Sequence, residues 1–125
     1  MPAGAYLRTA AAHLRDAAVE LQHEASAKEM ELDHERRRLE GEIKKKQAEI
    51  RMRQAALGTM HDDSERQKLD NEIRTYETQI QAHEHELSGK QSTISQSIDA
   101  KNSMATKLLS QAGNLDGMAG SADSV

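Results

Sequence analysis

The chain has 125 residues, of which 30% are charged and only 2% are aromatic, and its formal net charge is −4 at pH 7. It contains no Phe, Trp or Cys, so it lacks the bulky side chains that fill a thick globular core, and it has no thiol chemistry. This composition suits long helices with a narrow apolar seam. The acidic net charge argues against a general binder of polyanions.

The first half of the chain has the pattern of one long helix. Residues 1–5 are predicted to be a frayed start, and a helix is predicted over residues 6–57. Leucines recur every seven residues from Leu7, with alanines between them. This is a heptad pattern whose seam has one row of large side chains and one row of small side chains. After Lys28 the pattern changes to 11-residue steps, which locally unwind a left-handed supercoil. The predicted seam residues are Leu7, Leu14, Leu21, Leu32, Leu39, Ile43, Ile50 and Leu57.

A turn is predicted over residues 58–63. Gly58 follows the last apolar residue of the first helix, and we expect it to adopt the left-handed conformation that ends many helices. Potential capping boxes begin at Asp62 and at Ser64, because each is followed three residues later by Glu or Gln. The predicted turn residues are therefore Gly58, Asp62, Asp63 and Ser64.

The second half has the pattern of another long helix, predicted over residues 64–112. Its apolar residues alternate at steps of four and three, with one stutter between Ile94 and Ile98. Residues 113–125 are rich in Gly, Ser and Asp and are predicted to be a flexible tail. The predicted seam residues are Leu69, Ile73, Tyr76, Ile80, Leu87, Ile94, Ile98, Leu108 and Leu115.

The two helices are predicted to form an all-α fold, a long antiparallel two-helix coiled-coil hairpin. Reversal of the chain near His61 brings Ile50 opposite Ile73 and Ala18 opposite Ala105. It also lays residues 36–53, which have a net charge of +5, along residues 62–86, which have a net charge of −5. Opposite charges beside a seam favour one register. The alternative is a single uninterrupted helix that tolerates Gly58.

Two helices alone leave their apolar seam half exposed, and four further apolar residues lie off the main seam: Val19, Met30, Met52 and Met60. We therefore expect assembly into a helical bundle or docking to a larger helical complex. The sequence predicts a non-enzymatic coiled-coil structural or adaptor protein. Its expected partner is a second copy of the chain or another helical protein.

No catalytic, cofactor-binding or metal-binding residue is predicted. The segments 20–23 and 31–34 both read Glu-x-x-His, as in carboxylate-bridged di-metal bundles, but both point away from the seam. His83 and His85 are two residues apart, so their imidazoles point to different sides of a helix and do not share one ion. His83 occupies a seam position, where packing is expected to depend on pH.

Two alternative functions follow from the sequence. A small chain without a signal peptide or membrane span is expected to be cytoplasmic, or exported as a substrate, filament subunit, chaperone or stalk of a specialised secretion system. Its predicted shape is similar to that of small secreted helical hairpins with a Trp-x-Gly turn, but the turn here has Leu57-Gly58 and no Trp. The second alternative is weak nucleic-acid binding by residues 36–53. We do not favour it, because three consecutive cations wrap around a helix and no aromatic residue is interleaved. A small-molecule substrate is not expected either.

Overall fold

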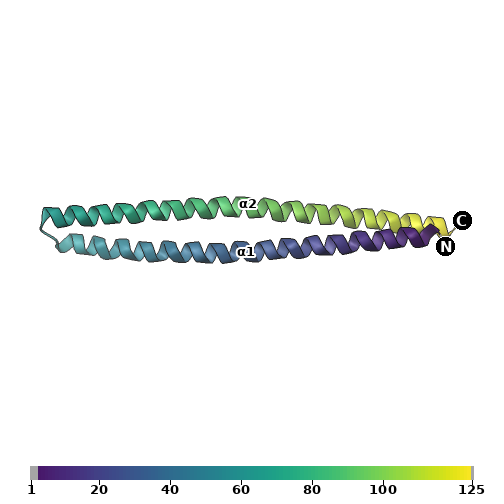
Figure 1. Cartoon of the computed structure of the whole chain (residues 1–125), viewed down its shortest axis with the longest axis horizontal. Coiled ribbons are helices and arrows are strands. Elements are labelled where there is room, and N and C mark those ends of the chain that lie inside the picture. The colour runs from purple at the N-terminus through teal and green to yellow at the C-terminus, as the bar shows by residue number, and fades with distance from the viewer. Residues whose placement is uncertain (1–2, 125) are drawn as a thin grey trace. The chain divides into compact units, whose positions relative to one another are not determined.

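A computed structural model describes residues 3–124 and contains two helices, α1 (Ala3–Thr59) and α2 (Asp63–Asp123). The helices run in opposite directions and pack against each other, which confirms the predicted all-α, two-helix hairpin fold (Figure 1). The chain divides into two units, the terminal unit (Met1–Met30 with Thr93–Val125) and the turn unit (Glu31–Ser92). Neither helix contains a stretch that is long and apolar enough to span a membrane.

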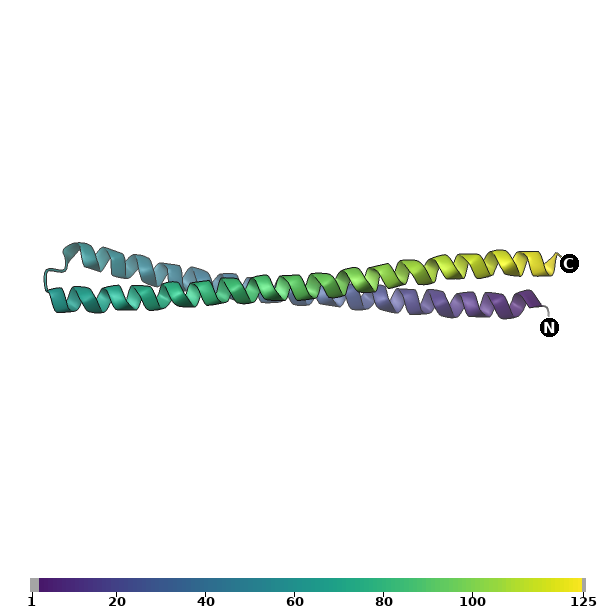
Figure 2. The same ribbon diagram turned by 90° about the horizontal axis from the view of Figure 1, so that it is seen from above.

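In the terminal unit, the two helices meet along rows of small residues. Six alanines are at most 2% exposed and recur every seven residues: Ala11, Ala18, Ala25, Ala105, Ala112 and Ala119. Small side chains allow two helices to approach closely. Gly4 continues the row on α1, and a β-carbon added there would meet the carboxylate of Asp123. The start of α1 therefore packs against the end of α2, at the end of the unit where Figure 2 shows both termini.

In the turn unit, larger aliphatic side chains form the seam. Leu39 is fully buried, and Ile73 and Ile80 are 7% and 9% exposed. Charged side chains also enter this interface, because Lys46 and Arg53 are only 19% and 22% exposed. Long basic side chains can bury their methylene stems while their charged ends reach the rim. The seam here is therefore partly ionic.

The turn itself comprises residues 60–62 and is shorter than the predicted range of 58–63. Asp62, one of the two residues predicted to begin a capping box, does cap α2, but its bond reaches the amide two residues later and not three. Its Oδ1 accepts a hydrogen bond of 3.1 Å from the backbone N–H of Ser64. This contact satisfies one of the unpaired amides at the start of the helix.

The predicted left-handed conformation of Gly58 is wrong. The helix α1 continues through Thr59, and no glycine among residues 3–124 has a positive φ. The end of α1 is closed instead by Arg66 of α2, whose Nη1 donates hydrogen bonds to the backbone oxygens of Leu57, at 2.7 Å, and Met60, at 2.9 Å. Because the guanidinium supplies donors to carbonyls that lack a helical partner, the helix ends without a left-handed residue.

Both helices are longer than the sequence predicts. The helix α1 begins at Ala3, within the range 1–5 that was predicted to fray, and residues 1–2 lie outside the described part. The helix α2 begins at Asp63 and continues to Asp123, so the predicted flexible tail is helical up to that residue. Only Val125 of the tail lies outside the described residues.

Packing explains why the C-terminal segment is helical despite its glycines. Ala119 is fully buried and continues the seven-residue row of Ala105 and Ala112. An ion pair also joins Asp123 to Arg8 on α1. Each glycine disfavours a helix by about 1 kcal/mol. Burial along the alanine row and contacts to α1 therefore outweigh local propensity.

Candidate functional site

All the predicted seam residues are at least partly buried. Five are buried: Leu32, Leu39, Ile73, Ile80 and Ile94. The remaining ones are half-buried: Leu7, Leu14, Leu21, Ile43, Ile50, Leu57, Leu69, Tyr76, Leu87, Ile98, Leu108 and Leu115. The half-buried residues leave part of their apolar side chains exposed on the surface of the helix pair.

The half-buried leucines of the terminal unit gather on one side of the helix pair. The opposite side is marked by the ion pair between Arg15 on α1 and Asp116 on α2. Residues two apart in a helix point about 200° from each other. Ala17 and Met118, two residues after Arg15 and Asp116, therefore lie on the side away from that ion pair. We call this side the apolar face, which consists of Leu7, Ala10, Leu14, Ala17, Leu21, Met104, Leu108, Leu115 and Met118.

The apolar face combines half-buried leucines with protruding methionines. Met104 and Met118 are 49% and 56% exposed. One end of the face is bordered by charged residues, because Lys101 donates a 2.8 Å hydrogen bond to Glu24 there. An apolar surface of this kind, with a polar end, is typical of a protein contact. Val19, Leu109 and Met30 are also exposed but lie on other sides of their helices.

A network of four charged residues links the helices in the turn unit. The Lys90 Nζ lies 2.7 Å from an oxygen of Glu35 and 3.2 Å from an oxygen of Glu86. Arg38 donates to Glu35 at 2.8 Å and lies 3.6 Å from Glu86. Two cations thus share two carboxylates across the helix pair. None of the four residues was predicted from the sequence as a functional residue, although Lys90 stands on the seam row of His83, seven residues later, which was the available signal.

The network shifts the titration of its members. Hydrogen bonds from Lys90 and then Arg38 lower the pKa of Glu35 to about 2. The hydrogen bond from Lys90 also lowers the pKa of Glu86. The hydrogen bonds to Glu35 and Glu86 raise the pKa of Lys90. These directions all favour the charged forms, as expected for mutually bonded opposite charges.

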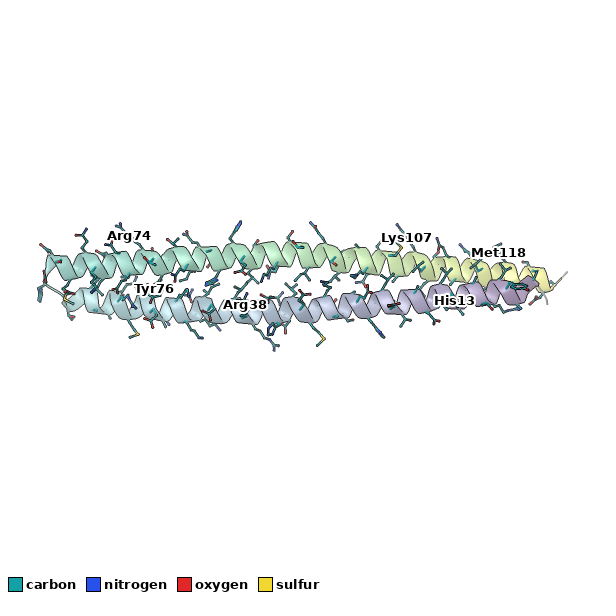
Figure 3. All side chains as sticks on the ribbon, in the orientation of Figure 1. His13, Arg38, Arg74, Tyr76, Lys107 and Met118 are labelled. Carbon is teal, nitrogen blue, oxygen red and sulfur yellow. The ribbon has the colours of Figure 1, made fainter. Side chains whose placement is uncertain are left out.

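A second cluster surrounds Arg53. Its guanidinium donates hydrogen bonds to Glu49, at 2.5 Å, and to Glu72, at 2.8 Å, and these bonds raise its pKa. It also lies 4.7 Å from the ring centre of Tyr76, which projects between the helices (Figure 3). The guanidinium is fully engaged within the chain, so the shallow hollow beside it offers no free cation to a ligand. That hollow is lined by Arg53, Glu72, Thr75, Tyr76 and Gln79.

The predicted alignment of basic and acidic segments occurs only in part. Arg38 and Arg53 pair with acids of α2, whereas Lys45 and Lys46 each lie 3.7 Å from Glu42 on their own helix. Lys46 is nevertheless largely covered, whereas Lys44, Lys45 and Arg51 are exposed. On α2, Arg74 likewise points away from α1 (Figure 3).

The histidine motifs do not come together in the described part of the chain. His23, His34 and His85 are exposed. His83 is half-buried, and its Nδ1 lies 3.8 Å from a carboxylate oxygen of Glu86. Among residues 3–124 there is no group of three His, Asp or Glu side chains placed to hold a metal ion.

Comparisons of the chain with protein-family models, with curated proteins and with solved structures each find no match. Functional assignment therefore rests on the apolar face and on the charge pattern of the two helices.

Proposed function

We propose that the protein is a non-enzymatic structural or adaptor module that acts by helix–helix self-association through the apolar face. The observation that carries this proposal is the contrast within the terminal unit. The alanine row is fully covered by the partner helix, whereas the leucine rows beside it are only half covered. Burying apolar area stabilises a contact by about 25 cal/mol per Å². The uncovered halves of five leucines and two methionines are therefore available to drive association.

Side-chain sizes on the apolar face favour a second copy as the partner. The α1 half carries the small residues Ala10 and Ala17, and the α2 half carries the protruding Met104 and Met118. When two copies face each other with their α1 helices pointing the same way, α1 of each copy lies against α2 of the other. Met104 of one copy then lies close to the level of Ala17 of its partner. The product is a four-helix arrangement with its apolar face enclosed.

Sedimentation equilibrium tests this proposal. The wild-type chain at micromolar concentration is expected to have at least the mass of a dimer at low and high salt, because apolar contacts do not weaken with salt. The variant Met104→Glu/Met118→Glu should be monomeric at high salt and should keep its helical circular dichroism. The double variant Met30→Glu/Met52→Glu provides a matched control, because these methionines are 73% and 65% exposed and lie off the apolar face. A fully helical wild-type monomer at high salt contradicts the proposal.

A further inference from the structure

The side of the turn unit that faces away from the charged network carries two outward stripes of opposite sign. Glu35 and Glu86 define one side, because Lys90 bonds both of them. Residues two apart in a helix point about 200° from each other. Arg37, two residues after Glu35, and Glu84, two residues before Glu86, therefore lie on the other side.

Seven-residue spacing extends each of these positions into a stripe. The basic stripe on α1 consists of Arg37, Lys44 and Arg51, and the acidic stripe on α2 consists of Asp70, Glu77 and Glu84. All six side chains are exposed. Their spacing matches the helical repeat of about 10.5 Å per heptad on both helices. One face of the turn unit thus presents a positive row beside a negative row.

Three charges of contrary sign accompany the stripes. Arg37 pairs with Asp33 at 3.0 Å, and Glu40 and Arg74 lie on the same side as the stripes. Nearer the turn, Arg51 has no acid of α1 three or four residues away, whereas Glu40 lies four residues before Lys44. Among residues 3–124, neither of these two cations takes part in an ion pair, and the same holds for Asp70 and Glu77. These four charges form the centre of the surface.

We propose that this striped face of the turn unit binds the same face of a second copy, with the two α1 helices pointing the same way. In that arrangement, α1 of each copy lies opposite α2 of the other, so each basic stripe meets an acidic stripe. This contact is separate from the apolar face of the terminal unit and does not depend on it.

The register inside one chain shows that the stripes align. Arg53 lies level with Glu72, and Arg38 lies level with Glu86, because each pair is in contact. The three stripe pairs, 37 with 84, 44 with 77 and 51 with 70, are all displaced from this register by the same amount. The displacement is about three to four residues, or about 4.5–6 Å along the axis, which long basic side chains can span. All three stripe pairs can therefore form at the same time in one alignment of the two copies.

The opposite orientation is disfavoured by the same charges. With the α1 helices pointing in opposite directions, each basic stripe would face the basic stripe of the partner, and each acidic stripe would face an acidic one. Juxtaposed like charges act against such a pairing. A nucleic acid is disfavoured for a similar reason, because the acidic stripe next to the basic one repels a polyanion.

Charge reversal in the Met104→Glu/Met118→Glu background tests the striped contact without the apolar face. This background should self-associate at about 50 mM salt and dissociate at about 500 mM, where charges are screened within a few ångströms. Adding Lys44→Glu/Arg51→Glu should weaken the low-salt association at least about tenfold, and so should adding Asp70→Lys/Glu77→Lys. Mixing these two reversed variants should restore association, because every facing stripe is then complementary. The exposed pair Lys45→Glu/Lys68→Glu, which lies off the stripes, is the control and should have a much smaller effect.

Spin labels report the orientation in the same background, since the chain contains no native cysteine. A label on His61→Cys at the turn should lie within about 30 Å of its counterpart when the α1 helices point the same way. It should lie about 50 Å away when they point in opposite directions about the centre of the stripes.

The inference is overturned if the background variant stays monomeric at low salt, if the reversed variants do not rescue each other, or if the labels are far apart. It is also overturned if a short duplex DNA binds the striped face more tightly than a second copy does. Loss of wild-type association at high salt, in contrast, contradicts only the proposed apolar contact. Failures of the two proposals are therefore distinguishable.

Discussion

Lys90 on α2 lies 2.7 Å from a carboxylate oxygen of Glu35 on α1, and this pair is the centre of the charged network of the turn unit. Each of the two residues has a second partner of opposite charge, Glu86 for Lys90 and Arg38 for Glu35. The contact joins the helices at a level where the seam holds charged as well as aliphatic residues. We therefore expect the association of the two helices to depend on pH.

The acid sensitivity of the fold should depend on Glu35. Its pKa is lowered from 4.5 to about 2, first by the hydrogen bond from Lys90 and then by that from Arg38. A carboxylate with a lowered pKa contributes stability above its unfolded pKa, and this contribution disappears as the pH falls through the folded value. Glu35→Gln should therefore lose less stability than the wild type between about pH 4.5 and about pH 2.

Urea unfolding followed by circular dichroism at several pH values measures this difference. Lys90→Met should likewise reduce the loss of stability on acidification, because it removes the largest cause of the shift. Glu40→Gln serves as the control, since Glu40 lies on the other side of the turn unit, away from the network. Equal acid losses in the wild type and Glu35→Gln would show that the network does not couple to folding.

The hydrogen bonds from Arg66 to the end of α1 should stabilise the last turn of that helix. Arg66→Ala removes two hydrogen bonds to backbone oxygens at the end of α1. Because the site is exposed to water, we expect a loss of about 1 kcal/mol in the free energy of unfolding. Amide hydrogen exchange should also accelerate in the last turn of α1. Arg74→Ala, which removes an outward-pointing arginine of the same helix, should change neither quantity appreciably.

The glycines in the middle of the helices offer stabilising substitutions. A β-carbon added at Gly41 or Gly89 meets no heavy atom within 4 Å. Gly41→Ala and Gly89→Ala should therefore each raise the free energy of unfolding by about 0.5–1 kcal/mol, mainly by restricting the unfolded chain. Gly4→Ala provides the contrast, because its β-carbon would meet the carboxylate of Asp123. Thermal unfolding curves that show the same stabilisation at Gly4 would contradict the close helix contact at that end.

The alanine row should not accept larger residues. Ala18 is 0% exposed, so Ala18→Leu must push the two helices apart in the terminal unit. Overpacking of this kind costs about 1–3 kcal/mol in the free energy of unfolding. Ala12→Leu makes the same chemical change at an exposed position and should alter stability by less than about 0.5 kcal/mol. Urea unfolding of both variants gives the comparison. Similar losses would mean that the alanines do not determine the spacing of the helices.

The sequence by itself determined the helical fold, the reversal near His61 and the seam rows, because heptad periodicity and capping residues act locally. Asp62 could be assigned as a cap for that reason, since its partner is two residues away.

Only tertiary structure decided where the helices end and which charges pair. The C-terminal segment is rich in glycine and reads as flexible, but the burial of Ala119 against α1 holds it in a helix. Gly58 reads as a left-handed helix stop, but Arg66 from the other helix satisfies the carbonyls instead. The network of Glu35 and Lys90 likewise joins residues far apart in the chain. In each case the stabilising partner lies on the other helix and comes near only when the chain folds. Local sequence patterns therefore do not predict these contacts.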